Sequence, residues 1–254
     1  MIPPKKIARR DNDDNRDRIS DLPDCVLLQI LSLLNSKHVV QTCVLSKRWK
    51  HLWKRIPTLI LHSSRFSTVK KFAILVSNIL TLRDASVALH ALDLDRIGII
   101  ESWLLYKILQ YVSSYNTHIH HLGISVTSES YLIMNCVSKC QDLTSLKLSV
   151  RDRWGSYETL FPKSLNLPLL TCLDLSNFAF SGDENSCVEP FSTFTRLNSL
   201  VICNCKVIKD AQTLIISSET LVNLALDYYS STSNFANTWW NSRLLATKLP
   251  VSGS

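Results

Sequence analysis

The sequence predicts an α/β fold, in which a short N-terminal helical unit is followed by a repeat array that builds a parallel sheet on one face. An apolar segment with helical spacing occupies residues 18–56. A leucine pattern then recurs every 24–33 residues as far as residue 226. Hydrophobic residues make up 46% of the 254 residues and charged residues 19%. These values are typical of globular chains and argue against a wholly disordered one.

Residues 1–17 are polar and charged throughout, and we expect a disordered leader there. Lys5-Lys6 and Arg9-Arg10 form two short basic pairs, a weak signal for nuclear localisation. The leader lacks the apolar core of a secretory signal, so we expect a protein of the nucleus, the cytoplasm or both. No apolar run approaches the ~18 residues that a membrane span needs, so we expect no membrane partner. The eight cysteines are expected to be reduced, buried and metal-free.

The net charge of +7 is unevenly distributed along the chain. Residues 1–71 contain 15 Lys/Arg and 6 Asp/Glu, whereas residues 72–254 contain 13 and 15. A basic N-terminal quarter fits a nucleic-acid contact, an acidic protein partner or a nuclear address. Solvated helix faces explain the same excess equally well.

The first helix of the N-terminal unit is expected to begin near Pro23, with Asp21 or Ser20 as its cap. Val26, Leu27, Ile30, Leu31 and Leu34 then form one apolar stripe at about 100° per residue. Leu28 and Leu33 extend the apolar surface beyond that stripe. Such a helix is either buried all round or covered by a partner.

Two further helices complete the predicted unit. Ser36 is expected to cap a second, short helix. Leu45, Trp49, Leu52 and Trp53 then share one face of a third helix, which Pro57 ends. The opposite face of that helix is basic, with Lys47, Arg48, Lys50, His51, Lys54 and Arg55. Three short helices bury little surface, so the unit needs to dock onto something else.

The rest of the sequence repeats the pattern L-x-x-L-x-L. The copies are Leu89/Leu92/Leu94, Ile119/Leu122/Ile124, Leu143/Leu146/Leu148, Leu170/Leu173/Leu175, Leu197/Leu200/Ile202 and Leu221/Leu224/Leu226, with Ile56/Leu59/Leu61 as a degenerate first member. Each copy predicts a short strand with its apolar side chains on one face, and stacked strands build a parallel sheet over a continuous apolar interior. Helices are expected at 104–115 and 131–137, with irregular or 3₁₀ connectors afterwards.

The N-terminal segment resembles an F-box. The resemblance rests on Asp21-Leu22-Pro23-Asp24, on the apolar stripe of the first helix, and on Val44-Leu45-Ser46-Lys47-Arg48-Trp49 with Leu52-Trp53. The following array resembles the leucine-rich repeats (LRRs) of plant F-box/LRR proteins. Cys205 occupies the Asn/Cys site of the repeat, three residues after the last apolar position of its copy, whereas Asn177 lies two residues after that of its own copy.

The resemblance implies an F-box at 18–57 and about six to seven repeats at 58–230, arranged as a solenoid with helices or irregular connectors on its second face. We expect an irregular tail at 231–254, with no clear cap for the last repeat, as in a truncated member. Asn35 and His38 depart from the residues that the family often has at the turn into the second helix.

The implied function is that of the substrate-recognition subunit of an SCF-type ubiquitin ligase. The F-box would bind the adaptor Skp1, and through it a cullin, while the repeats hold a protein target; neither catalysis nor a cofactor is implied. The adaptor-facing and core positions are not separated by sequence alone. They match Leu22, Pro23, Val26, Leu27, Ile30, Leu31, Leu34, Val44, Leu45 and Trp49.

The candidate target-binding face is the solvent-facing row of the predicted sheet, with Asp93, Lys147, Asp174 and Val201. His118 and His120 would share a strand face, and Cys136 and Cys140 a helical face, but neither pair makes a metal site by itself. The common hydrolase, metalloprotease and nucleotide-binding motifs do not occur. Two alternatives stay open: a basic helical nucleic-acid binder, against which the apolar first helix argues, and an LRR scaffold without a ligase role.

Overall fold

The computed structural model describes residue 19 and residues 21–114, 118–151, 159–181, 187–208, 213–227 and 245–247. The expected leader at 1–17 and the end of the predicted helix at Tyr115 lie outside the described residues. Within the range 231–254, where we expected an irregular tail, the structure describes Leu245–Thr247. These three residues form a strand, β12, which pairs with β10 (Thr213–Ser217).

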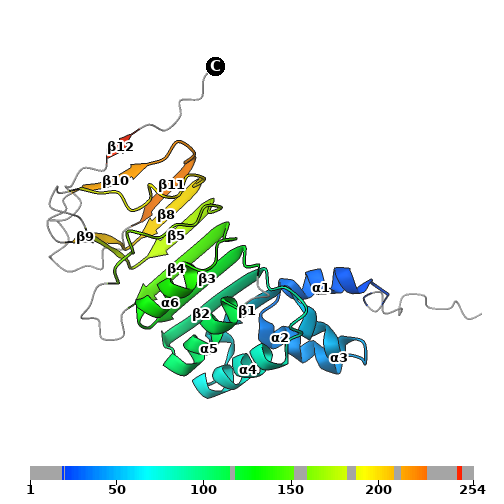
Figure 1. The fold of residues 1–254 in the computed structure, drawn as a ribbon. Helices are drawn as coiled ribbons and strands as arrows, with labels where there is room; N and C mark the ends of the chain where they lie inside the picture. Colours follow the sequence, from blue (N-terminus) through cyan, green and yellow to red (C-terminus); the bar gives the residue numbers. More distant parts are fainter. Residues whose placement is uncertain are drawn as a thin grey trace, which may run out of the picture.

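A seven-stranded parallel sheet runs through the molecule (Figure 1). Its order, β1-β2-β3-β4-β5-β8-β11, follows the order of the chain, so each strand lies beside the one formed by the next leucine pattern. The predicted parallel sheet is thereby confirmed, including the degenerate first copy, which supplies β1. The strands are β1 (Thr58–His62), β2 (Ala91–Ile99), β3 (His121–Thr127), β4 (Ser145–Arg151), β5 (Cys172–Ser176), β8 (Ser199–Cys203) and β11 (Asn223–Asp227).

The register of the sheet stacks the repeated leucines into two columns. Leu59 pairs with Leu92, and that column continues through Leu122, Leu146, Leu173, Leu200 and Leu224. The second column runs from Leu61 to Leu226 in the same way. In the first six strands every member is at most 2% exposed, so the columns form a continuous apolar interior. Burying these side chains supplies much of the free energy that holds the sheet together.

Three helices cover the interior face of the first strands: α4 (Val69–Leu82), α5 (Ser102–Val112) and α6 (Ser130–Val137). The helices predicted at 104–115 and 131–137 correspond to α5 and α6. The helix α4 was missed, although Phe72, Val76 and Ile79 are buried at helical spacing. Thr68 caps it, accepting a hydrogen bond from the backbone of Lys71 at 3.2 Å. A 3₁₀ turn, η4 (Ser63–Arg65), precedes it.

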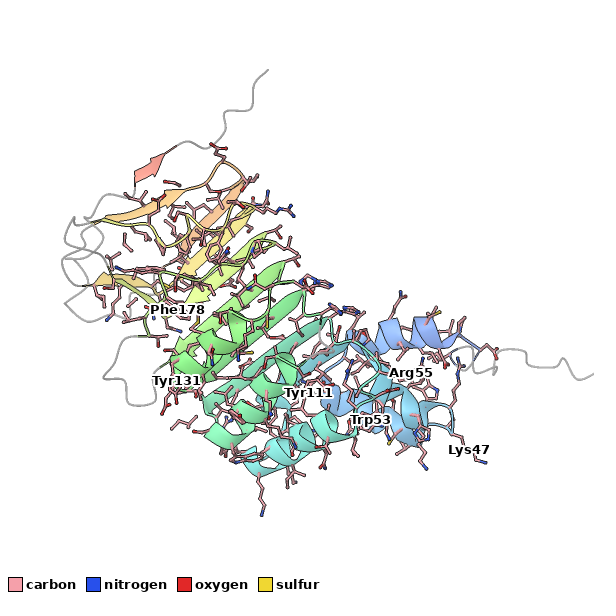
Figure 2. All side chains as sticks on the ribbon, viewed as in Figure 1. Lys47, Trp53, Arg55, Tyr111, Tyr131 and Phe178 are labelled. Carbon is pink, nitrogen blue, oxygen red and sulfur yellow. The ribbon has the colours of Figure 1, made fainter. Side chains whose placement is uncertain are left out.

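The later connectors were predicted to be irregular or 3₁₀, and among the described residues they contain neither an α-helix nor a 3₁₀ helix. Short strands replace helices there: β6 (Ala179–Ser181) pairs with β9 (Lys206–Ile208), and β7 (Cys187–Val188) pairs with β10. Phenylalanine side chains fill the space behind the sheet. The rings of Phe161, Phe178, Phe180 and Phe191 lie 5.6–6.0 Å apart in tilted and edge-to-face contacts; Phe178 is labelled in Figure 2.

Asparagines turn the chain after two of the strands. Asn177 and Asn204 have φ of 66° and 48°, a left-handed conformation that asparagine tolerates well. The amide of Asn204 donates to Oδ1 of Asn177 at 2.7 Å, linking successive turns. Beneath them, burial raises the pKa of the Cys205 thiol to about 11. Cys205 therefore packs as a neutral group and accepts a hydrogen bond from the Phe178 backbone at 3.4 Å.

A buried arginine joins the N-terminal unit to the sheet and its helices. Arg83, at the end of α4, is 7% exposed and uses all five of its N–H groups. Two of them donate to Ile56 O, at 2.9 and 3.2 Å, where the N-terminal unit ends. The others donate to Val87 O, Ala88 O and the Tyr111 hydroxyl of α5, each at 2.8–2.9 Å. The Arg83 guanidinium thus binds a carbonyl of the N-terminal unit and carbonyls of the segment that follows α4.

We expect Arg83→Met to lower the free energy of unfolding by about 2–4 kcal/mol, because it leaves buried carbonyls without donors. The measurement is urea unfolding followed by circular dichroism. Arg65→Met is the control, because that side chain is exposed and its loss should change stability by no more than about 0.5 kcal/mol. Equal stability of the two variants would contradict the role assigned to Arg83.

Candidate partner-binding surfaces

The N-terminal unit consists of α1 (Asp24–Ser32), α2 (Ser36–Gln41), η2 (Thr42–Val44), α3 (Trp49–Leu52) and η3 (Trp53–Arg55). Three local predictions are corrected. Pro23 itself holds the cap position of α1, with no side-chain cap among the described residues. Asn35 caps α2 in place of Ser36, accepting from the Lys37 backbone at 3.0 Å. The third helix is shorter than its periodicity predicts, so Leu45 lies in a turn before it rather than on the buried face of Trp49.

Part of the predicted adaptor-binding set lies in the chain's own core. Leu27, Leu31 and Trp49 are 0%, 1% and 6% exposed. They belong to the same apolar cluster as Leu59 of β1 and the leucine columns. The unit therefore docks onto the sheet, and these three side chains stabilise that docking from the inside. In this structure they are core residues and not surface contacts, a distinction that periodicity alone does not make.

The remaining members of the set reach solvent. Val44 and Leu45 are 82% and 64% exposed, and Pro23 is exposed as well. Ile30 and Leu34 are about two-fifths exposed, while Leu22 and Val26 are half-buried. We call the exposed apolar side chains of this unit the N-terminal apolar surface: Ile19, Pro23, Ile30, Leu33, Leu34, Val44 and Leu45. Ile19 and Leu33 were not in the predicted set, although Leu33 widens the apolar stripe in the sequence.

Leu33 is 80% exposed at the end of α1, two residues after the buried Leu31. Isolated exposed leucines are common, but several large apolar side chains on one small unit indicate an interaction surface. The chain's own interior is already filled by Leu27 and Leu31, so the side chains that remain outside have no packing role in this fold.

Basic side chains are frequent in this part of the chain. Residues 21–71 contain nine Lys/Arg and two Asp. One of these bases is structural: the Arg48 guanidinium lies 2.7 Å from Asp24 Oδ1 and also binds Leu22 O, which ties the start of α3 to the start of α1. Lys47, Lys50 and Arg55 are exposed, so the unit carries exposed positive charge as well as exposed apolar side chains; Lys47 and Arg55 are labelled in Figure 2.

The predicted target-binding residues lie together on the open face of the sheet, opposite the leucine columns. Asp93, Lys147, Asp174 and Val201 occupy one row of the register, with Gly123 between the first two. Lys147 Nζ lies 3.2 Å from Asp174 Oδ2, and Asp93 Oδ2 lies 2.7 Å from His62 Nε2. A Cβ at Gly123 would lie 2.7 Å from Asp93 Oδ1, so any larger residue at this position would clash with the carboxylate.

The histidine and cysteine pairs do not assemble into a metal centre. His118 Nδ1 lies 3.0 Å from Asp142, whereas His120 stacks on His90 with ring centres 5.5 Å apart. Cys140 donates to the carbonyl of Cys136 at 3.3 Å. Nowhere in the described ranges do three His, Cys, Asp or Glu side chains gather as a metal site would require. The described helices are also too short or too polar to cross a bilayer.

Comparisons with known proteins give the family of the chain. The model of the F-box domain matches residues 19–61, which cover the helical unit and all but the last residue of β1. The F-box/LRR-repeat protein At3g26922 of Arabidopsis thaliana is 31% identical over 227 residues, which are 87% of this chain and 71% of that protein. The chain belongs to the plant F-box/LRR-repeat proteins.

Other relatives of this F-box protein are considerably longer. F-box/LRR-repeat protein 13 of Arabidopsis thaliana is 31% identical over 187 residues, which are 70% of this chain and 39% of that relative. The FBD-associated F-box protein At4g10400 of the same plant is 27% identical over 205 residues, which are 76% of this chain and 44% of that relative. The chain thus spans about two-fifths of the length of these two proteins.

The separation of core from surface within the F-box is testable by stability. We expect Leu31→Ala to lower the free energy of unfolding by about 2–5 kcal/mol, because it leaves a cavity in a filled core. Val44→Ala should change it by no more than about 0.5 kcal/mol, because that side chain is mostly in water. Chemical denaturation of both variants measures the difference. Similar losses for the two would contradict the assignment of Val44 to the surface.

Proposed function

We propose that this F-box protein is the substrate-recognition subunit of an SCF-type ubiquitin ligase. The N-terminal apolar surface binds a Skp1-type adaptor, which links the chain to a cullin. The observation that carries the proposal is the high exposure of Leu33 and Val44 on a unit whose core is already filled. Covering such side chains with a partner's apolar groove is favourable in the same way as burying them in a core.

In this proposal the leucine-patterned region is an LRR solenoid, and its open sheet face holds a protein target. The strand order, the stacked leucine columns and the names of the relatives support this interpretation. The row from Asp93 to Val201 carries both signs of charge on strands fixed by a rigid interior. Electrostatic complementarity on such a face favours one partner over others more than it adds affinity.

The proposed mechanism is proximity, and the chain performs no bond chemistry itself. Holding adaptor and target on one rigid body raises the effective concentration of target lysines near a ubiquitin carrier. Rigidity matters because a loose connection would dilute that concentration over many orientations. The Arg83 contacts between Ile56 and Tyr111 supply such a connection. We place this activity in the nucleus, the cytoplasm or both.

The adaptor site is tested with the double variant Val44→Asp/Leu45→Asp. We expect its affinity for Skp1 to fall about tenfold or more, because two apolar contacts are replaced by charges that must be desolvated. Biolayer interferometry with purified Skp1 measures the loss. Ile74→Asp is the matched control, because Ile74 is an equally apolar side chain, 51% exposed, on α4 outside the F-box.

Equal affinity of the two variants for Skp1 would reject the assigned surface. If the unchanged chain binds no Skp1 paralogue, an LRR scaffold without a ligase role becomes the better interpretation. Binding to DNA that weakens steeply with salt would instead favour the basic residues as a nucleic-acid site.

The target face is tested by reversing its central ion pair. We expect Lys147→Asp/Asp174→Lys to lose target proteins while it keeps both the ion pair and Skp1 binding. Lys147→Glu should lose the same targets, whereas Lys139→Glu, at an exposed lysine off the sheet, should keep them. The measurement is affinity purification with the proteasome blocked, followed by quantitative mass spectrometry. Unchanged recovery of every partner by the reversed pair would contradict the assignment.

A further inference from the structure

The open face of the sheet has a glycine in the middle of β3. Gly123 lies between Asp93 of β2 and Lys147 of β4, and the register is regular on both sides of it, so it marks no bulge. Its backbone does not require a glycine either, because its φ is not positive. A glycine weakens the interior of a strand, and it often marks a place where a ligand approaches closely. What Gly123 contributes is the space that a side chain would fill.

The Asp93 carboxylate lies over this glycine. Its Oδ1 is 2.7 Å from the position that a Cβ at Gly123 would occupy. Its other oxygen, Oδ2, is held by His62 Nε2 at 2.7 Å. Among the described residues no donor meets Oδ1. One oxygen of a fixed carboxylate is therefore directed toward β3 and can accept a hydrogen bond from a partner.

A second carboxylate lies on the same strand and the same face. Asp95 follows Asp93 by two residues, so their Cα atoms are about 6–7 Å apart along β2. The register partners of Asp95 are His62 on β1 and the small Ser125 on β3. In the part of the chain that the structure describes, Asp95 forms no ion pair. The surface above Gly123 and Ser125 is thus bordered by two carboxylates on its β2 side.

The lysine beside Gly123 bonds in the other direction. Lys147 is the register partner of Gly123 on β4, but its Nζ lies 3.2 Å from Asp174 Oδ2 on β5. Its ion pair is therefore made with the strand beyond and not with Asp93 or Asp95. The β2 side of the open face keeps negative charge that a cation from a partner can complement.

We propose that this part of the open face receives an arginine side chain of the protein target. We call it the arginine site: Asp93, Asp95, Gly123 and Ser125. A guanidinium has N–H donors on two edges and can meet both carboxylates at once, whereas an ammonium acts as a point charge. The aliphatic part of the arginine packs over Gly123, where no side chain is in its way. The inference rests on the proposed function, because it takes the open face as the target-binding surface.

An arginine fits this site better than a metal ion does. Calcium takes about six to eight oxygen ligands. The arginine site offers two carboxylates at separate positions on one strand, and no group of three ligands occurs in the described ranges. An exposed ion pair contributes little affinity by itself. The arginine therefore selects which segment of a target binds, and contacts elsewhere on the face supply most of the affinity.

The test selects binders from a phage-displayed library of random peptides on the full chain. We expect the selected peptides to share an arginine. Synthetic copies should lose about tenfold or more in affinity when that arginine is replaced by alanine, and several-fold when it is replaced by lysine, which cannot bridge the two carboxylates. Isothermal titration calorimetry measures these affinities.

Two variants of the chain locate the bound arginine. Asp95→Asn removes one carboxylate and should lower the affinity for the selected peptide about fivefold or more. Asp227→Asn is the matched control, because Asp227 carries the same charge in the same row of the register on β11, and this variant should bind normally. Gly123→Ala keeps every charge but places a methyl group against Asp93 Oδ1, so it should also weaken binding. General attraction to an acidic surface would not respond to Gly123→Ala.

The reversed pair Lys147→Asp/Asp174→Lys separates this inference from the proposed function. Peptides that lack a shared arginine, but whose binding the reversed pair abolishes, would overturn the arginine site and leave the target face intact. Peptides that bind equally to the reversed pair, to Asp95→Asn and to Gly123→Ala would contradict both. Equal losses for Asp95→Asn and Asp227→Asn would overturn the arginine site, because they would reflect the charge of the whole face. So would a library from which the chain selects no peptide.

Discussion

The whole arrangement depends on the five hydrogen bonds of the Arg83 guanidinium. Apolar contacts join the F-box to the sheet, but they are non-directional and do not by themselves fix an orientation. Arg83 adds direction, because its planar fork must meet carbonyls of Ile56, Val87 and Ala88 and the hydroxyl of Tyr111 at once. A buried cation without an ion-pair partner is tolerated only when every donor is used. The same requirement that keeps Arg83 stable therefore holds the two parts of the chain in one geometry.

This connection explains why the F-box can leave apolar side chains in water. Three short helices alone bury too little surface to be stable, and they gain the rest from Leu59 and the leucine columns behind them. Leu27 and Leu31 face that interior. Once Leu27 and Leu31 are buried, Leu33, Val44 and Leu45 contribute little to the packing of the fold. In the proposed function their exposure marks a surface kept for a partner, and the sheet supplies the stability that such a surface would otherwise reduce.

Periodicity was sufficient to predict the large sheet, because every strand repeats the same spacing and each copy confirms the others. It located Leu59 to Leu226 on one face, and α5 and α6 between the strands. It did not divide the F-box stripe into core and surface, because helical spacing places both Leu31 and Leu34 on the same apolar stripe. That division depends on where the sheet lies. Periodicity also placed Leu45 on the third helix, which begins only at Trp49 in the structure. Where so short a helix begins and ends depends on its tertiary contacts more than on its own sequence.

The apolar side chains at the two ends of the leucine columns are covered in different ways. Stacked repeats bury each strand's apolar face against the next, so the first and last strands need other cover. At β1 the F-box provides it, and the unit that covers the columns is also the one that leaves Val44 exposed. At β11 the described chain provides less, and Leu226 stays partly in water.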